Sequence, residues 1–134
     1  MFRKLGLVAT AVLFFATAAF TLHPKWTSVP LTNFVPFKFV FPLLEPGNAH
    51  YELRNVFGNT LLWVPAAVAA TLLWKNAKRA VALVAIAATT AEVVQYVAGR
   101  RVVDVDDVIL ACFGAIIAAN LTLLLRNRLS PVGD

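Results

Sequence analysis

The stretch Ala80–Leu125 decides the fold, and it reads AVALVAIAATTAEVVQYVAGRRVVDVDDVILACFGAIIAANLTLLL. Two apolar runs, Ala80–Ala98 and Val108–Leu125, flank a short charged link. Each run can cross a hydrocarbon core of about 30 Å as a helix, which takes roughly 17–25 residues. The stretch therefore predicts two transmembrane helices joined by a short link.

Two further apolar runs are long enough to span, Leu5–Leu22 and Val56–Trp74. The first follows Arg3 and Lys4, as the core of a signal peptide would. It is longer than the usual signal core of about 7–15 residues, so we expect it to be retained as an anchor. The sequence predicts an all-α integral membrane bundle of four transmembrane helices, in one domain over residues 1–134.

The overall composition agrees with a membrane protein. Of the 134 residues, 60% are hydrophobic, which is far above the composition of a soluble domain. The net charge is +5, but the basic residues stand at the ends of apolar runs and form no stripe interleaved with aromatics. This pattern argues against a nucleic-acid partner. The single cysteine, Cys112, excludes an intrachain disulfide and a cysteine-based zinc site.

The positive-inside rule predicts the orientation of the bundle. With four spans, both termini share a side with the acid-free turn Lys75–Arg79. That side carries seven cations, namely Arg3, Lys4, Lys75, Lys78, Arg79, Arg126 and Arg128, against five on the other side. We therefore expect a multi-pass protein of the cell membrane with cytoplasmic N- and C-termini.

The only long connection, from His23 to Arg54, is rich in proline and phenylalanine. Prolines remove backbone donors and prevent a continuous helix, so this segment should not span the membrane. Its phenylalanines suit the level of the lipid headgroups. We interpret the segment as an extracytoplasmic loop that lies on the bundle.

The uncommon polar residues gather at the predicted outer end. Four of the seven acidic residues fall within the sixteen positions from Glu92 to Asp107, although a charge inside a bilayer is costly and should have a partner or a task. The predicted ligand-binding residues are Asn55, Asn59, Glu92, Gln95, Arg101, Asp104, Asp106 and Asp107.

Each of these residues also has a purely structural interpretation. Glu92 and Gln95 lie three positions apart on one helix face, where they either clamp helices or form a site with Arg100 or Arg101. Asn55 and Asn59, one helical turn apart, either hold helices together or join the same polar pocket.

The acidic run has its own two interpretations. A helix N-terminus favours Asp at the cap and in the first turn, which accounts well for Asp106 and Asp107 and less well for Arg101 and Asp104. Clustered carboxylates could also hold a divalent cation, but spacing alone assigns no metal. Three other residues are expected to act structurally, because Pro65 should kink the second span, and Gly58 and Gly114 should permit close helix approach.

The chain resembles the VanZ-like family of membrane proteins, which is associated with resistance to the glycopeptide teicoplanin. The resemblance covers about Asn33 to Leu125 and rests most specifically on the run from Arg101 to Gly114. Supporting motifs are Asn33-Phe34-Val35-Pro36-Phe37, Asn55-Val56-Phe57-Gly58-Asn59, Pro65, and Glu92-Val93-Val94-Gln95. After the paired Asp, the family pattern usually continues to Asn-Thr, whereas this chain has Ala111 and Cys112.

The resemblance and the polar residues together suggest a membrane protein that binds an anionic amphiphile or an envelope-lipid headgroup at the outer leaflet. The implied partner is a membrane lipid or a lipophilic glycopeptide, with Arg101 as the anion contact. Two alternatives stay open, an intramembrane enzyme acting on lipid-linked substrates and a structural partner subunit. No Ser-His-Asp, Cys-His or HExxH grouping occurs, so the sequence assigns no catalytic residue and no cofactor.

Overall fold

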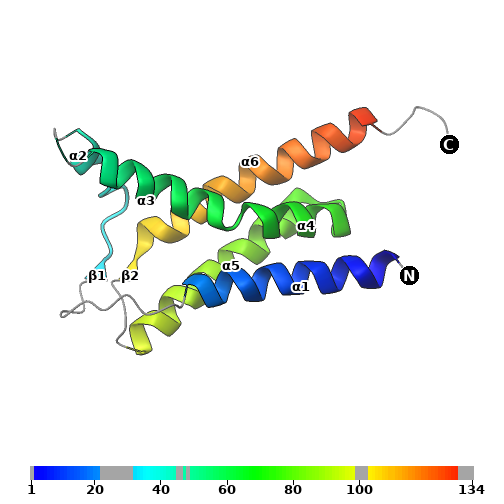
Figure 1. Ribbon diagram of the computed structural model, residues 1–134, viewed down its shortest axis with the longest axis horizontal. Helices are drawn as coiled ribbons and strands as arrows, with labels where there is room; N and C mark the ends of the chain where they lie inside the picture. The colour runs from blue at the N-terminus through cyan, green and yellow to red at the C-terminus, as the bar shows by residue number, and fades with distance from the viewer. Residues whose placement is uncertain (1, 22–31, 45–46, 48, 99–102, 130–134) are drawn as a thin grey trace.

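The computed structural model describes residues 2–21, 32–44, 47, 49–98 and 103–129. The elements follow in the order α1 (Phe2–Thr21), β1 (Thr32–Asn33), α2 (Val40–Leu43), α3 (Ala49–Leu62), α4 (Val64–Trp74), α5 (Ala77–Val97), β2 (Val103–Asp104) and α6 (Val105–Leu129). The long helices lie side by side along the longest axis of the molecule, and α6 packs against α3, α4 and α5 (Figure 1). The predicted all-α architecture is confirmed, with one small parallel β-pair added.

Within the described residues, three helical segments are long and apolar enough to cross a membrane, namely Ala49–Trp74, Ala77–Val97 and Val105–Leu129. They correspond to three of the four predicted spans. The remaining predicted span corresponds to α1, which is not among these segments. Its crossing of the membrane stays a prediction. Helix α1 nevertheless packs against α4. The distance between the ring centroids of Phe14 and Trp63 is 5.8 Å.

The core of the bundle is made of small side chains, whereas large apolar ones face outward. Alanines dominate the buried clusters, at positions 66, 67, 70, 80, 88, 91, 111, 115, 118 and 119. Exposed residues on the spans include Leu61, Ile86, Val97, Phe113 and Leu121. Small residues allow helices to approach closely inside lipid, where the hydrophobic effect does not hold helices together. This distribution is typical of a membrane bundle.

A break at Trp63 separates α3 from α4, with Pro65 in the first turn of α4. Proline has no N–H to donate to the preceding turn and its ring clashes with that turn. The predicted kink of the second span by Pro65 is confirmed.

The two glycines behave differently. A Cβ on Gly114 would overlap the backbone carbonyl oxygen of Thr60, so α3 and α6 approach there as predicted. A Cβ on Gly58 would have no atom within 4 Å. The expectation that Gly58 permits a close helix contact is therefore wrong, because this residue points away from the packed face of α3.

The turn between α4 and α5 is tight and has clear local causes. Lys75 adopts a left-handed conformation with φ of 52° and donates its N–H to the Thr71 carbonyl, which ends α4. Asn76 then caps α5 by accepting the Arg79 N–H at 3.0 Å. This turn, the start of α1 and the end of α6 lie at one end of the molecule (Figure 1).

The opposite end carries residues 32–44, which we call the strap, together with β2 and the start of α6 (Figure 1). The one helix in the strap is the four-residue α2, as expected for a segment with Pro36 and Pro42. Its first residues pair in parallel with β2, in the register Thr32↔Val103 and Asn33↔Asp104. The strap therefore lies on the bundle without crossing it.

The two ends of the molecule should be accessible from opposite sides of the membrane. In a Cys112→Ala background, we expect an impermeant maleimide added to intact cells to label Lys38→Cys in the strap and not Lys78→Cys at the α5 start. Both side chains are exposed, and the acid-free Lys75–Arg79 turn should stay inside. Labelling of Lys78→Cys without cell lysis would reverse the predicted orientation.

Candidate functional site

The polar residues at the strap end are joined into one hydrogen-bonded network, and Asp104 stands at its centre. Asp104 Oδ1 accepts the side-chain N–H of Asn33 at 2.7 Å and the backbone N–H of Asp106 at 2.9 Å. The backbone N–H of Asp104 in turn donates to Glu92 Oε2 at 3.1 Å. Asp104 thus links the strap, α5 and the first turn of α6.

Asp106 binds the strap directly. Its Oδ1 accepts the Phe37 N–H at 2.6 Å and its Oδ2 accepts the Phe39 N–H at 3.3 Å. The side chain is only 3% exposed, so these charged acceptors work in an environment with little water, where such bonds are strong. Asp106 holds the strap against the start of α6.

These contacts correct the sequence interpretation of the acidic run. A helix N-terminus was expected to explain Asp106 and Asp107 better than Asp104. In the structure Asp104 is the cap, because it precedes Val105 and accepts the N–H two residues on. Asp106 and Asp107 lie in the first turn of α6 and accept bonds from other segments. The difference arises because the helix begins at Val105, one residue before Asp106.

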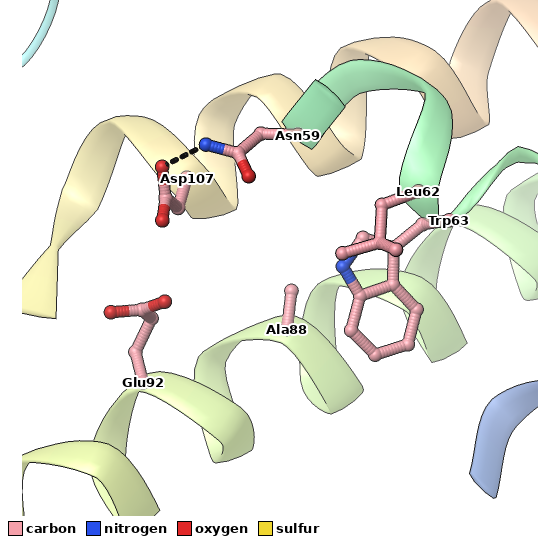
Figure 2. Close-up of a pocket in the computed structure, with 6 residues that line it drawn as sticks. All are labelled: Asn59, Leu62, Trp63, Ala88, Glu92 and Asp107. Atoms are coloured by element: carbon pink, nitrogen blue, oxygen red, sulfur yellow. Dashed lines mark hydrogen bonds between the residues drawn. The ribbon is translucent and has the colours of Figure 1, made fainter. Parts of the chain in front are cut away.

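Asp107 faces α3, where it accepts a hydrogen bond from the side-chain amide of Asn59 (Figure 2). That amide also lies 3.4 Å from Asn55 Oδ1, one helical turn earlier. The prediction that Asn55 and Asn59 share a helix face agrees with this bond. Asn59 belongs to the network, whereas Asn55 is exposed and contributes only through Asn59.

Glu92 points from α5 toward Asp107 across a small cavity (Figure 2). The cavity is lined by Asn59, Leu62, Trp63, Ala88, Glu92 and Asp107, and it encloses about 10 Å³. A single water molecule needs about 10–15 Å³. The space between the two carboxylates is thus of the size of one water and far below that of a headgroup.

Glu92 and Gln95 are both buried on one face of α5, with exposures of 6% and 3%. Residues three positions apart on a helix share a face, so the burial of both side chains agrees with the prediction from their spacing. The bond from Asp104 to Glu92 ties α5 to the start of α6. Glu92 therefore acts at least as a structural link between the two helices.

A larger, apolar groove opens beside this network. It has a volume of about 280 Å³ and is lined by Phe34, Thr89, Glu92, Val93, Tyr96, Val103, Asp104, Val105 and Val108. The carboxylates of Glu92 and Asp104 engage hydrogen bonds of the network, and the surface of the groove itself is hydrocarbon. The groove suits an alkyl chain.

Arg100 and Arg101 lie outside the described residues. The predicted anion contact at Arg101 therefore stays a prediction. Among the described residues, no group of three His, Cys, Asp or Glu side chains is arranged to hold a metal ion. Ala111, where the family pattern has a polar residue, is fully buried in the cluster that contains Trp63 and Ala88. Cys112 is partly buried beside it.

Sequence reasoning missed the partners that the strap provides. Asn33 lies 71 positions before Asp104, and the Phe37 and Phe39 contacts to Asp106 are made by backbone N–H groups. Backbone donors leave no mark in the residue pattern. The only signal in the sequence is the motif Asn33–Phe37, which supports the family resemblance but does not by itself indicate a contact with the acidic run.

Comparison with known proteins gives one match. The family model described as VanZ/LLP1 matches residues 4–126, a range that includes most of α1 and the whole polar network. Neither the curated proteins nor the solved structures contain a match.

Proposed function

Because the chain belongs to the VanZ/LLP1 family, we propose that it is a membrane protein that binds an amphiphile with an anionic group at the outer leaflet. Envelope lipids and lipophilic glycopeptides have this chemistry. The proposal extends to tolerance of teicoplanin, a glycopeptide with an acyl chain. The strap end would then face the outer leaflet.

The groove of about 280 Å³ carries this proposal. Its walls come from four segments, with Phe34 from the strap, Val93 and Tyr96 from α5, Val103 from β2, and Val105 and Val108 from α6. An apolar slot next to a polar network offers separate places for the hydrocarbon and the headgroup of one molecule. Ligand sites are commonly of this kind, with apolar walls and a few polar groups nearby.

The headgroup contact would come from Arg101, which stands two positions before Val103 in the sequence. A guanidinium can bind a phosphate or carboxylate through two parallel hydrogen bonds. Glu92 and Gln95 would form the buried polar wall of the site. Asp104, Asp106 and Asp107, with Asn55 and Asn59, would hold the strap, α5, α6 and α3 in place around it.

The geometry favours binding over catalysis. An enzyme that uses Glu92 and Asp107 as acid and base would need space for its substrate between them. The cavity there has the size of one water molecule. The groove, in contrast, has space for an alkyl chain and presents a hydrocarbon surface, while the carboxylates of Glu92 and Asp104 engage hydrogen bonds of the network.

The test compares two neighbouring substitutions on α5. In a susceptible Gram-positive host, we expect the protein to raise the inhibitory concentration of teicoplanin more than that of vancomycin, which lacks the acyl chain. Val93→Trp should abolish this effect, because Val93 lines the groove. Val94→Trp should preserve it, since Val94 is also exposed on α5 but is not part of the groove.

Purified protein gives the matching binding measurement. Native mass spectrometry with phosphatidylglycerol should show retention that Val93→Trp removes and that Arg101→Ala weakens by about a hundredfold, the loss of two charged hydrogen bonds. Arg101→Lys should recover little if the contact is bidentate. Equal behaviour of the Val93 and Val94 variants, at equal abundance in the membrane, would refute the groove as the site.

A further inference from the structure

The strap exposes a row of large apolar side chains that the bundle does not cover. Phe34, Phe37, Phe41 and Leu44 are 68%, 56%, 70% and 77% exposed. Val35 and Val40 on the same segment are exposed as well. Several large apolar side chains exposed on one short segment mark a surface that contacts a membrane or another partner.

The strap is held so that this row stays outward. Phe37 has a positive φ of 61°, a conformation that a bulky residue rarely adopts. The conformation is fixed by the Phe37 N–H bond to the buried Asp106 carboxylate and by a turn in which Val40 donates to the Phe37 carbonyl at 3.1 Å. Backbone strain persists where the surroundings enforce it, commonly at functional positions.

The position and charge of the strap indicate what covers the row. Tyr51 at the start of α3 and Tyr96 near the end of α5 are both exposed at this end of the bundle. Tyrosine is enriched at the boundary between membrane and water. Tyr51 also carries the Arg54 guanidinium over its ring, at 5.5 Å. The strap sequence, residues 32–44, has one charged residue, Lys38, and no acid.

We propose that the strap is an interfacial anchor, which inserts Phe34, Phe37, Phe41 and Leu44 into the boundary between lipid headgroups and acyl chains. Lys38 then lies among the headgroups, where anionic lipids attract it. The long helices also expose large apolar side chains, such as Phe57 on α3 and Val97 on α5, so the same bilayer covers the strap and the helices. Phe34 also lines the groove, and the anchor thereby places the open side of the groove at lipid depth.

Spin labelling measures the depth of the strap directly. In a Cys112→Ala background, labels on Phe41→Cys and Leu44→Cys are compared with a label on Lys78→Cys, which is exposed at the opposite end. The protein is reconstituted in vesicles of phosphatidylcholine and phosphatidylglycerol. Power saturation with oxygen and with a nickel chelate should place both strap labels about 5–10 Å below the headgroups, and the Lys78 label in water.

Two results would overturn the anchor. Nickel accessibility at Phe41 and Leu44 equal to that at Lys78 would mean that the strap faces water. Spin–spin broadening that disappears on dilution with unlabelled protein would mean that a second copy of the chain covers the row. Neither result depends on lipid retention in the groove, so the anchor and the proposed binding function can fail separately.

Discussion

Replacing Gly114 by alanine is expected to destabilise the bundle strongly. A Cβ at this position would overlap the Thr60 carbonyl oxygen and lie 3.0 Å from the carbonyl carbon. These are backbone atoms in the last turn of α3 and cannot turn aside as a side chain could, so α3 and α6 must separate. Overpacking of this kind costs about 1–3 kcal/mol and occasionally more, and we expect the upper part of that range.

Gly58→Ala is the matched control, because Gly58 also lies inside a helix but has open space at its Cβ position. There the substitution should be neutral or stabilising by about 0.5–1 kcal/mol, the usual gain of alanine over glycine in a helix. Unfolding of both variants in detergent micelles, followed by circular dichroism, gives the comparison. Equal stability of the two variants would show that α3 and α6 do not approach at Gly114.

Removing the Asp106 carboxylate is expected to detach the strap. Asp106→Ala leaves the Phe37 and Phe39 N–H groups without their acceptor. Hydrogen bonds to a charged group contribute about 1.5–3 kcal/mol each, so the loss should be about 3 kcal/mol or more. We expect faster amide hydrogen exchange in residues 35–40, with exchange in the centres of α5 and α6 much less affected.

Asp106→Asn separates the hydrogen bonds from the charge. Asparagine keeps one carbonyl oxygen and can accept the shorter bond, from Phe37, while it loses the second acceptor. Exchange in residues 35–40 should therefore be intermediate between the native protein and Asp106→Ala. Unchanged exchange in Asp106→Ala would mean that the strap is held by its other contacts, the β1–β2 pairing and the Asn33–Asp104 bond.

The sequence was sufficient to predict the helices, because each depends on local properties of the chain. Apolar runs of spanning length predicted the three helical segments that are long and apolar enough to cross a membrane. Pro65 predicted the break in the second of the four predicted spans, since the cost of proline in a helix depends only on its own backbone. The ends of the helices were less accurate. α3 begins at Ala49 and α6 at Val105, before the apolar runs. At α6 the added residues Asp106 and Asp107 have partners in other segments.

For the site, the sequence determined which residues are unusual and at which end of the bundle they gather. A charged carboxylate inside a bilayer costs free energy, so carboxylates in an apolar chain are conspicuous. Glu92, Asp104, Asp106 and Asp107 were therefore identified from the sequence. Only the tertiary structure decided what each one binds. The partner of Asp104 lies 71 positions away, and those of Asp106 are backbone N–H groups in a distant segment. Hydrogen bonds act over about 3 Å of space regardless of chain separation, and no local pattern encodes that proximity.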